Sequence, residues 1–208
     1  MKQYKSLYSD LEFERAGLFK LIRETYSCRE VLYPGCSIHI KPSFFFPHIV
    51  YVDQSQDAAR FFAQEKPVLE FVNRHKNYKQ SAYIRFIHQD YSTPLPFMDG
   101  SFDLLLAIFA GGISKACARY LKAGGVLITN NHQEDAFDAA QDESLQFTST
   151  IRFHKGKYQI EHGNSEDRKF NTRRPNNKYL KQTSEGLAYM ENETYYVFRH
   201  KHYRLSHY

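Results

Sequence analysis

The residues best placed to do chemistry are a glycine-containing turn and two aspartates, each at or just beyond the end of an apolar run. These candidate ligand-binding residues are the turn Pro34–Ser37 after residues 30–33, Asp53 after residues 48–52, and Asp90 after residues 83–87. A glycine lets a ligand approach the backbone closely, and a carboxylate at a strand tip accepts hydrogen bonds from ribose hydroxyls. The layout is that of a nucleoside-binding βαβ unit. Because this stretch has only Gly35 of the three glycines in a full fingerprint, a plain buried hairpin or crossover explains it equally well.

Short apolar runs alternate with helical patterns along the first 130 residues. The expected strands cover residues 30–33, 48–52, 83–87, 102–109 and 126–129. Such alternation predicts an α/β fold with a parallel, doubly wound sheet. In these sheets ligands bind beyond the carboxyl ends of the strands, at the switch point of the strand order. We therefore expect Gly35, Asp53, Asp90 and the pair Phe109-Ala110 to converge at one edge of the sheet.

Capping residues and glycines set the predicted helix boundaries. Ser9 or Asp10 is expected to begin an N-terminal helix with an apolar stripe at Leu11, Leu18, Leu21 and Ile22. Ser55 is expected to cap a helix within residues 54–80, and Pro67 to restart it as a second segment. A helix over residues 114–121 is expected to stop at Ala123-Gly124-Gly125.

The last third of the chain is predicted to form an antiparallel extension. An acidic helix is expected over 134–146, a hairpin of residues 147–153 and 157–162 around His154-Lys155-Gly156, and a last strand over 195–205. Residues 163–186 are polar and basic and are expected to form a long loop. The whole chain, 1–208, is thus expected to be a single domain, with an N-terminal helix in 1–29, a nucleoside-binding core in 30–130 and the extension in 131–208.

Composition excludes several classes of protein. The 208 residues carry a formal charge of +5, which is mild for a dedicated nucleic-acid binder. Cys28, Cys36 and Cys117 are widely spaced and form neither a zinc pattern nor a disulfide framework, and the histidines form no metal-ligand pair. The sequence lacks a membrane-length apolar run and a signal-peptide pattern. We therefore expect a cytoplasmic protein without a metal site.

Four segments, taken in order, resemble the class I S-adenosylmethionine (SAM)-dependent methyltransferases. The family begins with a strand like VLDLGCGxG, continues with an acid after the second strand and a segment like GDAxxLPFxDxSFDLV, and ends this region with RVLKPGGxL. The matching segments here are VLYPGCS at 31–37, YVD at 51–53, HQDYSTPLPFMDGSFDLL at 88–105 and RYLKAGGVL at 119–127. The resemblance covers about half of the chain and implies a Rossmann-like fold that binds SAM.

The resemblance also implies which residues hold the cofactor. By position these are Pro34, Gly35, Cys36 and Ser37 for the methionine part, Asp53 for the ribose, Gln54 and Asp90 with Tyr91 for the adenine, and Phe109 and Ala110 beside the sulfonium. Two features depart from the family. Tyr33 stands where an acid is usual, and Ser37, Ile38 and His39 replace small residues that give the cofactor room.

Methyl transfer needs little from side chains because the sulfonium is already activated, so the lack of an obvious catalytic triad excludes nothing. His132, after the fifth strand, is a candidate general base, although a loop histidine is more often simply solvated. The expected function is a SAM-dependent methyltransferase with a small-molecule acceptor. The alternatives are a non-catalytic member that binds a ligand or partner, and an RNA methyltransferase or RNA binder that uses the basic residues 168–181. Only Phe170 and Tyr179 could stack bases there.

Overall fold

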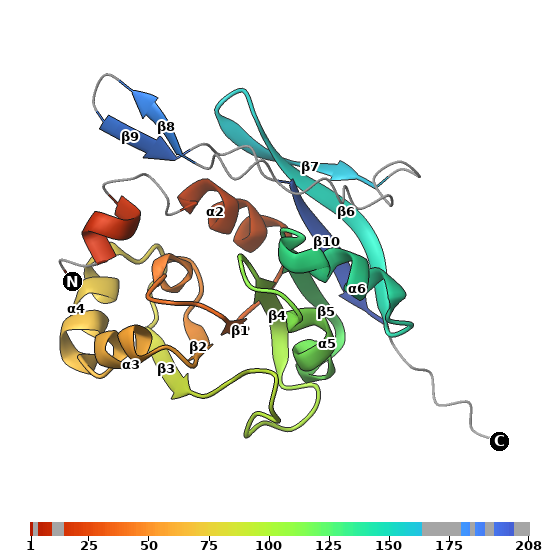
Figure 1. The fold of residues 1–208 in the computed structure, drawn as a ribbon, viewed down its shortest axis with the longest axis horizontal. Helices are drawn as coiled ribbons and strands as arrows, with labels where there is room; N and C mark the ends of the chain where they lie inside the picture. The colour runs from red at the N-terminus through yellow and green to blue at the C-terminus, as the bar shows by residue number, and fades with distance from the viewer. Residues whose placement is uncertain (2–3, 10–14, 164–179, 184–185, 190–193, 202–208) are drawn as a thin grey trace.

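An eight-stranded mixed sheet forms the centre of the molecule (Figure 1). The computed structural model describes residues 1, 4–9, 15–163, 180–183, 186–189 and 194–201. The strands are β1 (Glu30–Pro34), β2 (His48–Asp53), β3 (Tyr83–His88), β4 (Phe102–Ala107), β5 (Leu121–Thr129), β6 (Leu145–His154), β7 (Lys157–His162) and β10 (Thr194–His200). Their order is β3-β2-β1-β4-β5-β10-β6-β7. The first five are parallel and the last three antiparallel, which confirms the predicted α/β fold and its C-terminal extension.

Helices cover both faces of this sheet and bury two separate apolar clusters. On one face lie α2 (Ala16–Thr25), a short 3-10 turn η2 (Lys41–Phe44), α3 (Gln56–Phe62) and α4 (Glu65–His75). On the other lie α5 (Ile113–Cys117), followed by the turn η3 (Ala118–Tyr120), and α6 (Asp135–Gln141). Strand residues alternate between the clusters. Val31 and Leu104 belong to the first, and Leu32 and Leu105 to the second. This is the period-two pattern of a sheet buried on both faces.

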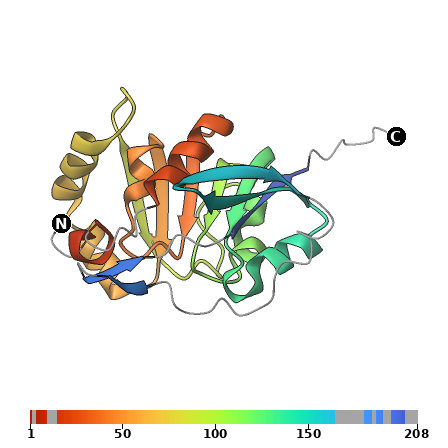
Figure 2. The same ribbon diagram turned by 90° about the horizontal axis from the view of Figure 1, so that it is seen from above.

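The parallel half of the sheet changes direction between β1 and β4. The chain runs outward from β1 to β2 and β3, then crosses back so that β4 pairs with the other side of β1. In Figure 2 the red-to-yellow part of the main sheet accordingly lies to one side and the green part to the other. The carboxyl ends of β1 and β4 therefore define the switch point at which this class of sheet binds ligands.

The helices after β2 follow the predicted capping closely. The Ser55 hydroxyl accepts a hydrogen bond from the Ala58 backbone N–H at 3.2 Å, which confirms Ser55 as the N-cap of α3. The second segment, α4, begins at Glu65, so Pro67 lies inside its first turn and does not start it. Proline is tolerated there because the first backbone N–H groups of a helix have no intrahelical partner.

The N-terminal helix begins later than predicted. A five-residue π-helical turn, η1, spans Lys5–Ser9, and α2 begins at Ala16 after Arg15 in a left-handed conformation with φ 53°. The expected start at Ser9 or Asp10 was therefore wrong for α2, and residues 10–14, including Leu11, lie outside the described residues. The rest of the predicted stripe is confirmed, since Leu18 and Ile22 are fully buried and Leu21 packs beside them.

The glycine pair Gly124-Gly125 does not end a helix. It lies inside β5, where Phe102 of β4 pairs with Leu121 but Leu104 pairs with Val126. This shift forces extra residues into β5, and Gly124 takes φ +78° there. Glycine supplies the conformation that such a bulge requires. The preceding helix is correspondingly short, because α5 ends at Cys117 and one 3-10 turn completes the segment.

Three boundaries in the C-terminal part also differ from the prediction. The acidic helix α6 is shorter than residues 134–146, because β6 already begins at Leu145. The expected loop over 163–186 contains a strand, β8 (Leu180–Thr183), which pairs with β9 (Gly186–Tyr189). The β8–β9 pair lies apart from the main sheet in both views (Figures 1 and 2). The last strand β10 ends at His200, and residues 202–208 lie outside the described part. Among the described helices, none has the length and apolar character needed to cross a bilayer.

Candidate functional site

Asp53, at the end of β2, is tied by hydrogen bonds to the turn that follows β1. The Ser37 backbone N–H donates to Asp53 Oδ2 at 2.8 Å, and the Ser55 N–H donates to Oδ1 at 2.8 Å. Ser37 reaches this position in a left-handed conformation with φ 49°. Each carboxylate oxygen can accept two hydrogen bonds. Asp53 is partly exposed, so it keeps acceptor capacity toward the sheet edge.

Asp90 provides a second carboxylate just beyond β3. Its Oδ1 accepts the Ser92 backbone N–H at 2.8 Å, and this hydrogen bond lowers the pKa of Asp90 below its ordinary value. The group is therefore ionised at neutral pH. Gln54, directly after Asp53, is exposed, and its carbonyl accepts a hydrogen bond from His88 Nε2 at 2.9 Å. Since Asp53 pairs with His88 in the sheet, Asp53, Gln54 and Asp90 come to the same edge.

Gly35 is packed tightly against the loop after β4. It has φ +64°, and a Cβ added to it would lie 2.4 Å from Ala110 Cβ and 3.5 Å from Tyr91 Cε1. The Tyr91 hydroxyl donates to the Gly111 carbonyl at 2.9 Å, so the ring spans from the end of β3 to this loop. The space that the missing side chain of Gly35 leaves is therefore occupied by Ala110 and Tyr91 of the same chain in this conformation.

Phe109, in the loop beyond β4, lies against His132, which follows β5. Phe109 has φ +62°, and its N–H donates to Asn130 Oδ1 at 3.2 Å. The His132 ring meets the Phe109 ring edge-on, with centroids 6.2 Å apart. Burial lowers the pKa of His132 below 6.5, so the imidazole is neutral at pH 7 and has a nitrogen that can accept a proton.

Three of the residues proposed from the resemblance face the core. Pro34 is the buried last residue of β1. The Tyr33 hydroxyl shares a hydrogen bond with His39 Nδ1 at 3.1 Å, and burial raises the pKa values of Tyr33 and Cys36 well above their ordinary values. These two groups are therefore uncharged at neutral pH. Within the turn only the side chain of Ser37 is exposed, and the Gly35 backbone N–H donates to the Val52 carbonyl at 2.8 Å.

N-terminal residues cover this edge, and sequence reasoning did not foresee them. The Tyr8 ring stacks on His39 at 4.7 Å, and Tyr8 forms a hydrogen bond with Ser37. The Arg15 guanidinium lies 4.3 Å from the centre of the Phe109 ring, and Arg15 Nε donates to the Tyr195 hydroxyl at 2.8 Å. Arg15 is only 1% exposed. Nothing in the local sequence distinguishes it from a surface arginine at the start of a helix.

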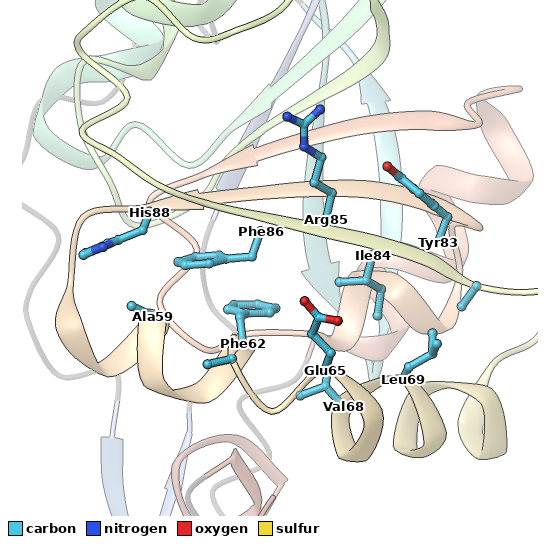
Figure 3. Close-up of a pocket in the computed structure, with 12 residues that line it drawn as sticks. Ala59, Phe62, Glu65, Val68, Leu69, Tyr83, Ile84, Arg85, Phe86 and His88 are labelled. Atoms are coloured by element: carbon cyan, nitrogen blue, oxygen red, sulfur yellow. The ribbon is translucent and has the colours of Figure 1, made fainter.

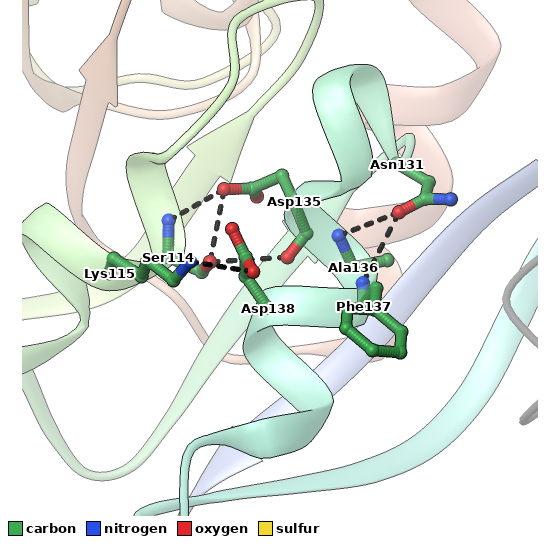
Figure 4. A network of polar contacts seen from close by, with 7 residues as sticks. All are labelled: Ser114, Lys115, Asn131, Asp135, Ala136, Phe137 and Asp138. Carbon is green, nitrogen blue, oxygen red and sulfur yellow. Dashed lines mark hydrogen bonds and ion pairs between the residues drawn. The ribbon is translucent and has the colours of Figure 1, made fainter. Parts of the chain in front are cut away.

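A buried carboxylate joins α5 to α6 behind the loop (Figure 4). Asp135 is fully buried, and its Oδ1 accepts the Ser114 N–H at 2.8 Å and the Ser114 hydroxyl at 3.0 Å. Asn131 Oδ1 accepts the Ala136 N–H at 2.9 Å, which ties the loop after β5 to α6. Burial raises the pKa of Asp135 above 3.8, although its hydrogen bonds act in the opposite direction. The network holds α5 and α6 in place below the loop that carries Phe109.

Asp135→Ala is expected to lower the free energy of unfolding by about 1–3 kcal/mol, because the Ser114 backbone N–H loses its buried acceptor. The Ser114 hydroxyl keeps the backbone carbonyl of residue 135 as an acceptor at 3.1 Å. Asp135→Asn keeps an acceptor. With the folded-state pKa raised, the Asp135 contribution to stability is full below pH 3.8 and is lost as pH rises through the raised value. We expect the asparagine variant to lack this loss, so urea melts should show it gaining on the wild type as pH rises. A constant difference at all pH values would contradict the assignment.

The arrangement of sheet, helices and strand-end residues is the Rossmann-like fold of SAM-dependent methyltransferases. No family model matches the sequence, and neither does any curated protein sequence. Solved structures do match. N-methyltransferase NodS from Bradyrhizobium japonicum WM9, in complex with S-adenosyl-L-homocysteine, is 14% identical with a TM-score of 0.54, over 92% of this chain and 88% of that one. A possible histamine N-methyltransferase from Thermotoga maritima is 12% identical with a TM-score of 0.53, over 97% and 95%. At these identities the likeness establishes the fold.

Proposed function

We propose that this chain is a SAM-dependent methyltransferase that acts on a small-molecule acceptor. The observation that carries the proposal is the convergence of the Gly35 turn, Asp53, Asp90 and Phe109 at the carboxyl edge of the sheet, around the switch point between β1 and β4. In sheets of this class that edge is where nucleosides bind. A structure with the same fold holds S-adenosyl-L-homocysteine.

The exposed groups fit the adenosine half of SAM. Asp53 keeps acceptor capacity for ribose hydroxyls, and the ionised Asp90 can accept a hydrogen bond from the adenine amino group. When bound, SAM supplies an electrophilic methyl group on a sulfonium. The residues of the chain then have to align the acceptor and remove its proton. Neutral His132, packed on Phe109, is our candidate to take that proton at an imidazole nitrogen.

The N-terminal cover favours a small acceptor. Tyr8 lies on the turn after β1 and Arg15 on Phe109 after β4, so described N-terminal residues cover both sides of the switch point. A covered edge admits a small molecule more readily than a folded macromolecule. Residues 164–179, which contain most of the basic segment considered for RNA binding, lie outside the described residues.

The packing around Gly35 favours a second candidate, a protein that binds a nucleoside without methyl transfer. Ala110 and Tyr91 fill the space beside Gly35, where the methionine part of SAM is expected from the family resemblance. If this packing persists with ligand present, only the adenosine half contributes to binding.

Calorimetric titration of the protein with SAM, S-adenosylhomocysteine and adenosine separates the two candidates. The methyltransferase predicts micromolar binding of S-adenosylhomocysteine and at least tenfold weaker binding of adenosine, because the methionine part adds contacts. Equal affinities would favour the second candidate. The absence of heat and of a thermal shift with all three ligands at millimolar concentration would exclude both.

A further inference from the structure

An open groove runs along the outer edge of the main sheet, away from the nucleoside edge. Its volume is about 510 Å³, and it lies between β3 and the helices α3 and α4 (Figure 3). The apolar lining includes Ala59, Phe62, Val68 and Leu69 from the helices and Ile84 and Phe86 from the strand. The Phe62 and Phe86 rings stack nearly parallel with centroids 4.6 Å apart, which makes a flat apolar floor.

The backbone of β3 presents hydrogen-bonding groups to this groove. β3 is the edge strand, with only β2 beside it in the described sheet. The Tyr83 N–H donates to the Pro47 carbonyl and the Gln89 N–H to the Asp53 carbonyl, both toward β2. Because backbone groups alternate direction along a strand, the N–H and C=O of Ile84, Phe86 and His88 point outward. They form a short template for another strand.

Exposed apolar side chains lie on both sides of this strand edge. Leu69 is 39% exposed beside the groove, and Tyr83 is 53% exposed on the opposite face of β3, together with Arg85 (Figure 3). They are two of the four large hydrophobic side chains exposed in the described part of the chain, the others being Met98 and Phe137. Apolar side chains gathered beside an open strand edge mark an interaction surface more strongly than isolated ones do.

We propose that the β3 edge binds an extended segment of a protein partner, which adds a strand to the sheet. The segment would place apolar residues at alternate positions into the groove and a lysine or arginine opposite Glu65. Main-chain hydrogen bonds to Ile84, Phe86 and His88 supply affinity in this mode of binding, and the alternating side chains supply specificity.

Glu65 decides between this partner and a second copy of the chain. It is exposed at the start of α4, points toward the strand in Figure 3, and forms no ion pair with any described residue. If two copies paired edge to edge in one continuous sheet, the copy would direct its Ile84, Phe86 and His88 side chains into the groove. The Arg85 side chain of that copy would lie on the opposite face of the sheet. In each chain the Arg85 guanidinium carbon lies there 5.3 Å from the centre of the Phe97 ring. A partner segment with a basic residue on the groove side is the better electrostatic match.

Two synthetic hexapeptides test the proposal, acetyl-Leu-Thr-Lys-Thr-Leu-Thr-amide and the same peptide with Glu in place of Lys. Binding is followed by NMR titration of the full chain and by amide hydrogen exchange. We expect the Lys peptide to bind with a submillimolar Kd, at least tenfold more tightly than the Glu peptide. It should slow exchange at Ile84, Phe86 and His88 and leave Arg85 unchanged. Glu65→Lys should reverse the preference between the peptides.

Ile84→Pro is the sharpest variant, because it removes an outward N–H while sparing the hydrogen bonds to β2. It should weaken binding of the Lys peptide at least tenfold, and the control Ile84→Val should bind normally. A thermal melt checks that both variants fold. The proposal is wrong if neither peptide binds at millimolar concentration, or if Ile84→Pro binds as the wild type does. A dimer in sedimentation that Ile84→Pro dissociates would assign the edge to a second copy and would also overturn it.

Discussion

Asp53→Ala is expected to weaken binding of S-adenosylhomocysteine by about 10- to 150-fold. Hydrogen bonds to a charged group contribute about 1.5–3 kcal/mol, and each 1.4 kcal/mol corresponds to a factor of ten in Kd. The effect has a direct and an indirect part. The carboxylate is lost as an acceptor for the ribose, and the Ser37 and Ser55 N–H groups lose the acceptor that holds the turn after β1 in place. Isothermal titration calorimetry measures the change.

Asp53→Asn separates these two parts. Its amide oxygen can still accept one of the two backbone N–H groups, so the turn is disturbed less while the negative charge is gone. We expect the asparagine variant to melt close to the wild-type temperature and still to bind S-adenosylhomocysteine several-fold more weakly. Unchanged affinity in both variants would mean that the nucleoside does not lie against Asp53, and would refute the proposed pose.

Gly35→Ala is expected to lower the free energy of unfolding by about 2–4 kcal/mol. A left-handed conformation costs a non-glycine residue roughly 1 kcal/mol, and overpacking a tight contact costs about 1–3 kcal/mol more. Both penalties apply here, because Gly35 has φ +64° and the new Cβ would lie 2.4 Å from Ala110 Cβ. Urea denaturation monitored by circular dichroism gives the difference directly.

The double variant Gly35→Ala with Ala110→Gly isolates the steric part. Removing the Ala110 methyl group relieves the clash and leaves only the backbone strain at residue 35, so most of the lost stability should return. The coupling energy of this cycle is expected to be at least 1 kcal/mol in the stabilising direction, as for residues in direct contact. Simple additivity of the two substitutions would show that Gly35 and Ala110 are not packed together in solution.

The parallel core of the fold could be predicted because its signals are local. The strands around Val31, Ile49 and Leu104 are short apolar runs buried on both faces, and such runs are recognisable without knowledge of their neighbours. Gly124 was misread for the opposite reason. A glycine that ends a helix and a glycine that forms a bulge look alike in sequence, and only the register between β4 and β5 distinguishes them.

The residues of the candidate site also fall into two groups, those that could be predicted from local sequence and those that could not. Asp53 and Asp90 are placed at the edge by strands of predictable length, so their positions followed from the sequence. Arg15 and Tyr8 reach the site through contacts with distant parts of the chain, and no local pattern indicates such contacts. The tight packing of Ala110 on Gly35 could not be predicted from the sequence either, because it depends on how the loop after β4 folds back.

The position of β10 sets a condition on how this protein is made. β10 lies between β5 and β6, although about 40 residues separate it from β6 along the chain. While the ribosome is still adding residues 155–190, β5 has an open flank and β6 has no neighbour that links it to the rest of the sheet. The Arg15–Tyr195 hydrogen bond, which joins residues 180 positions apart, also cannot form until Tyr195 has been synthesised. Folding of the nascent chain can therefore be completed only after residues 194–200 have left the exit tunnel, and until then the β5 edge is open to aggregation.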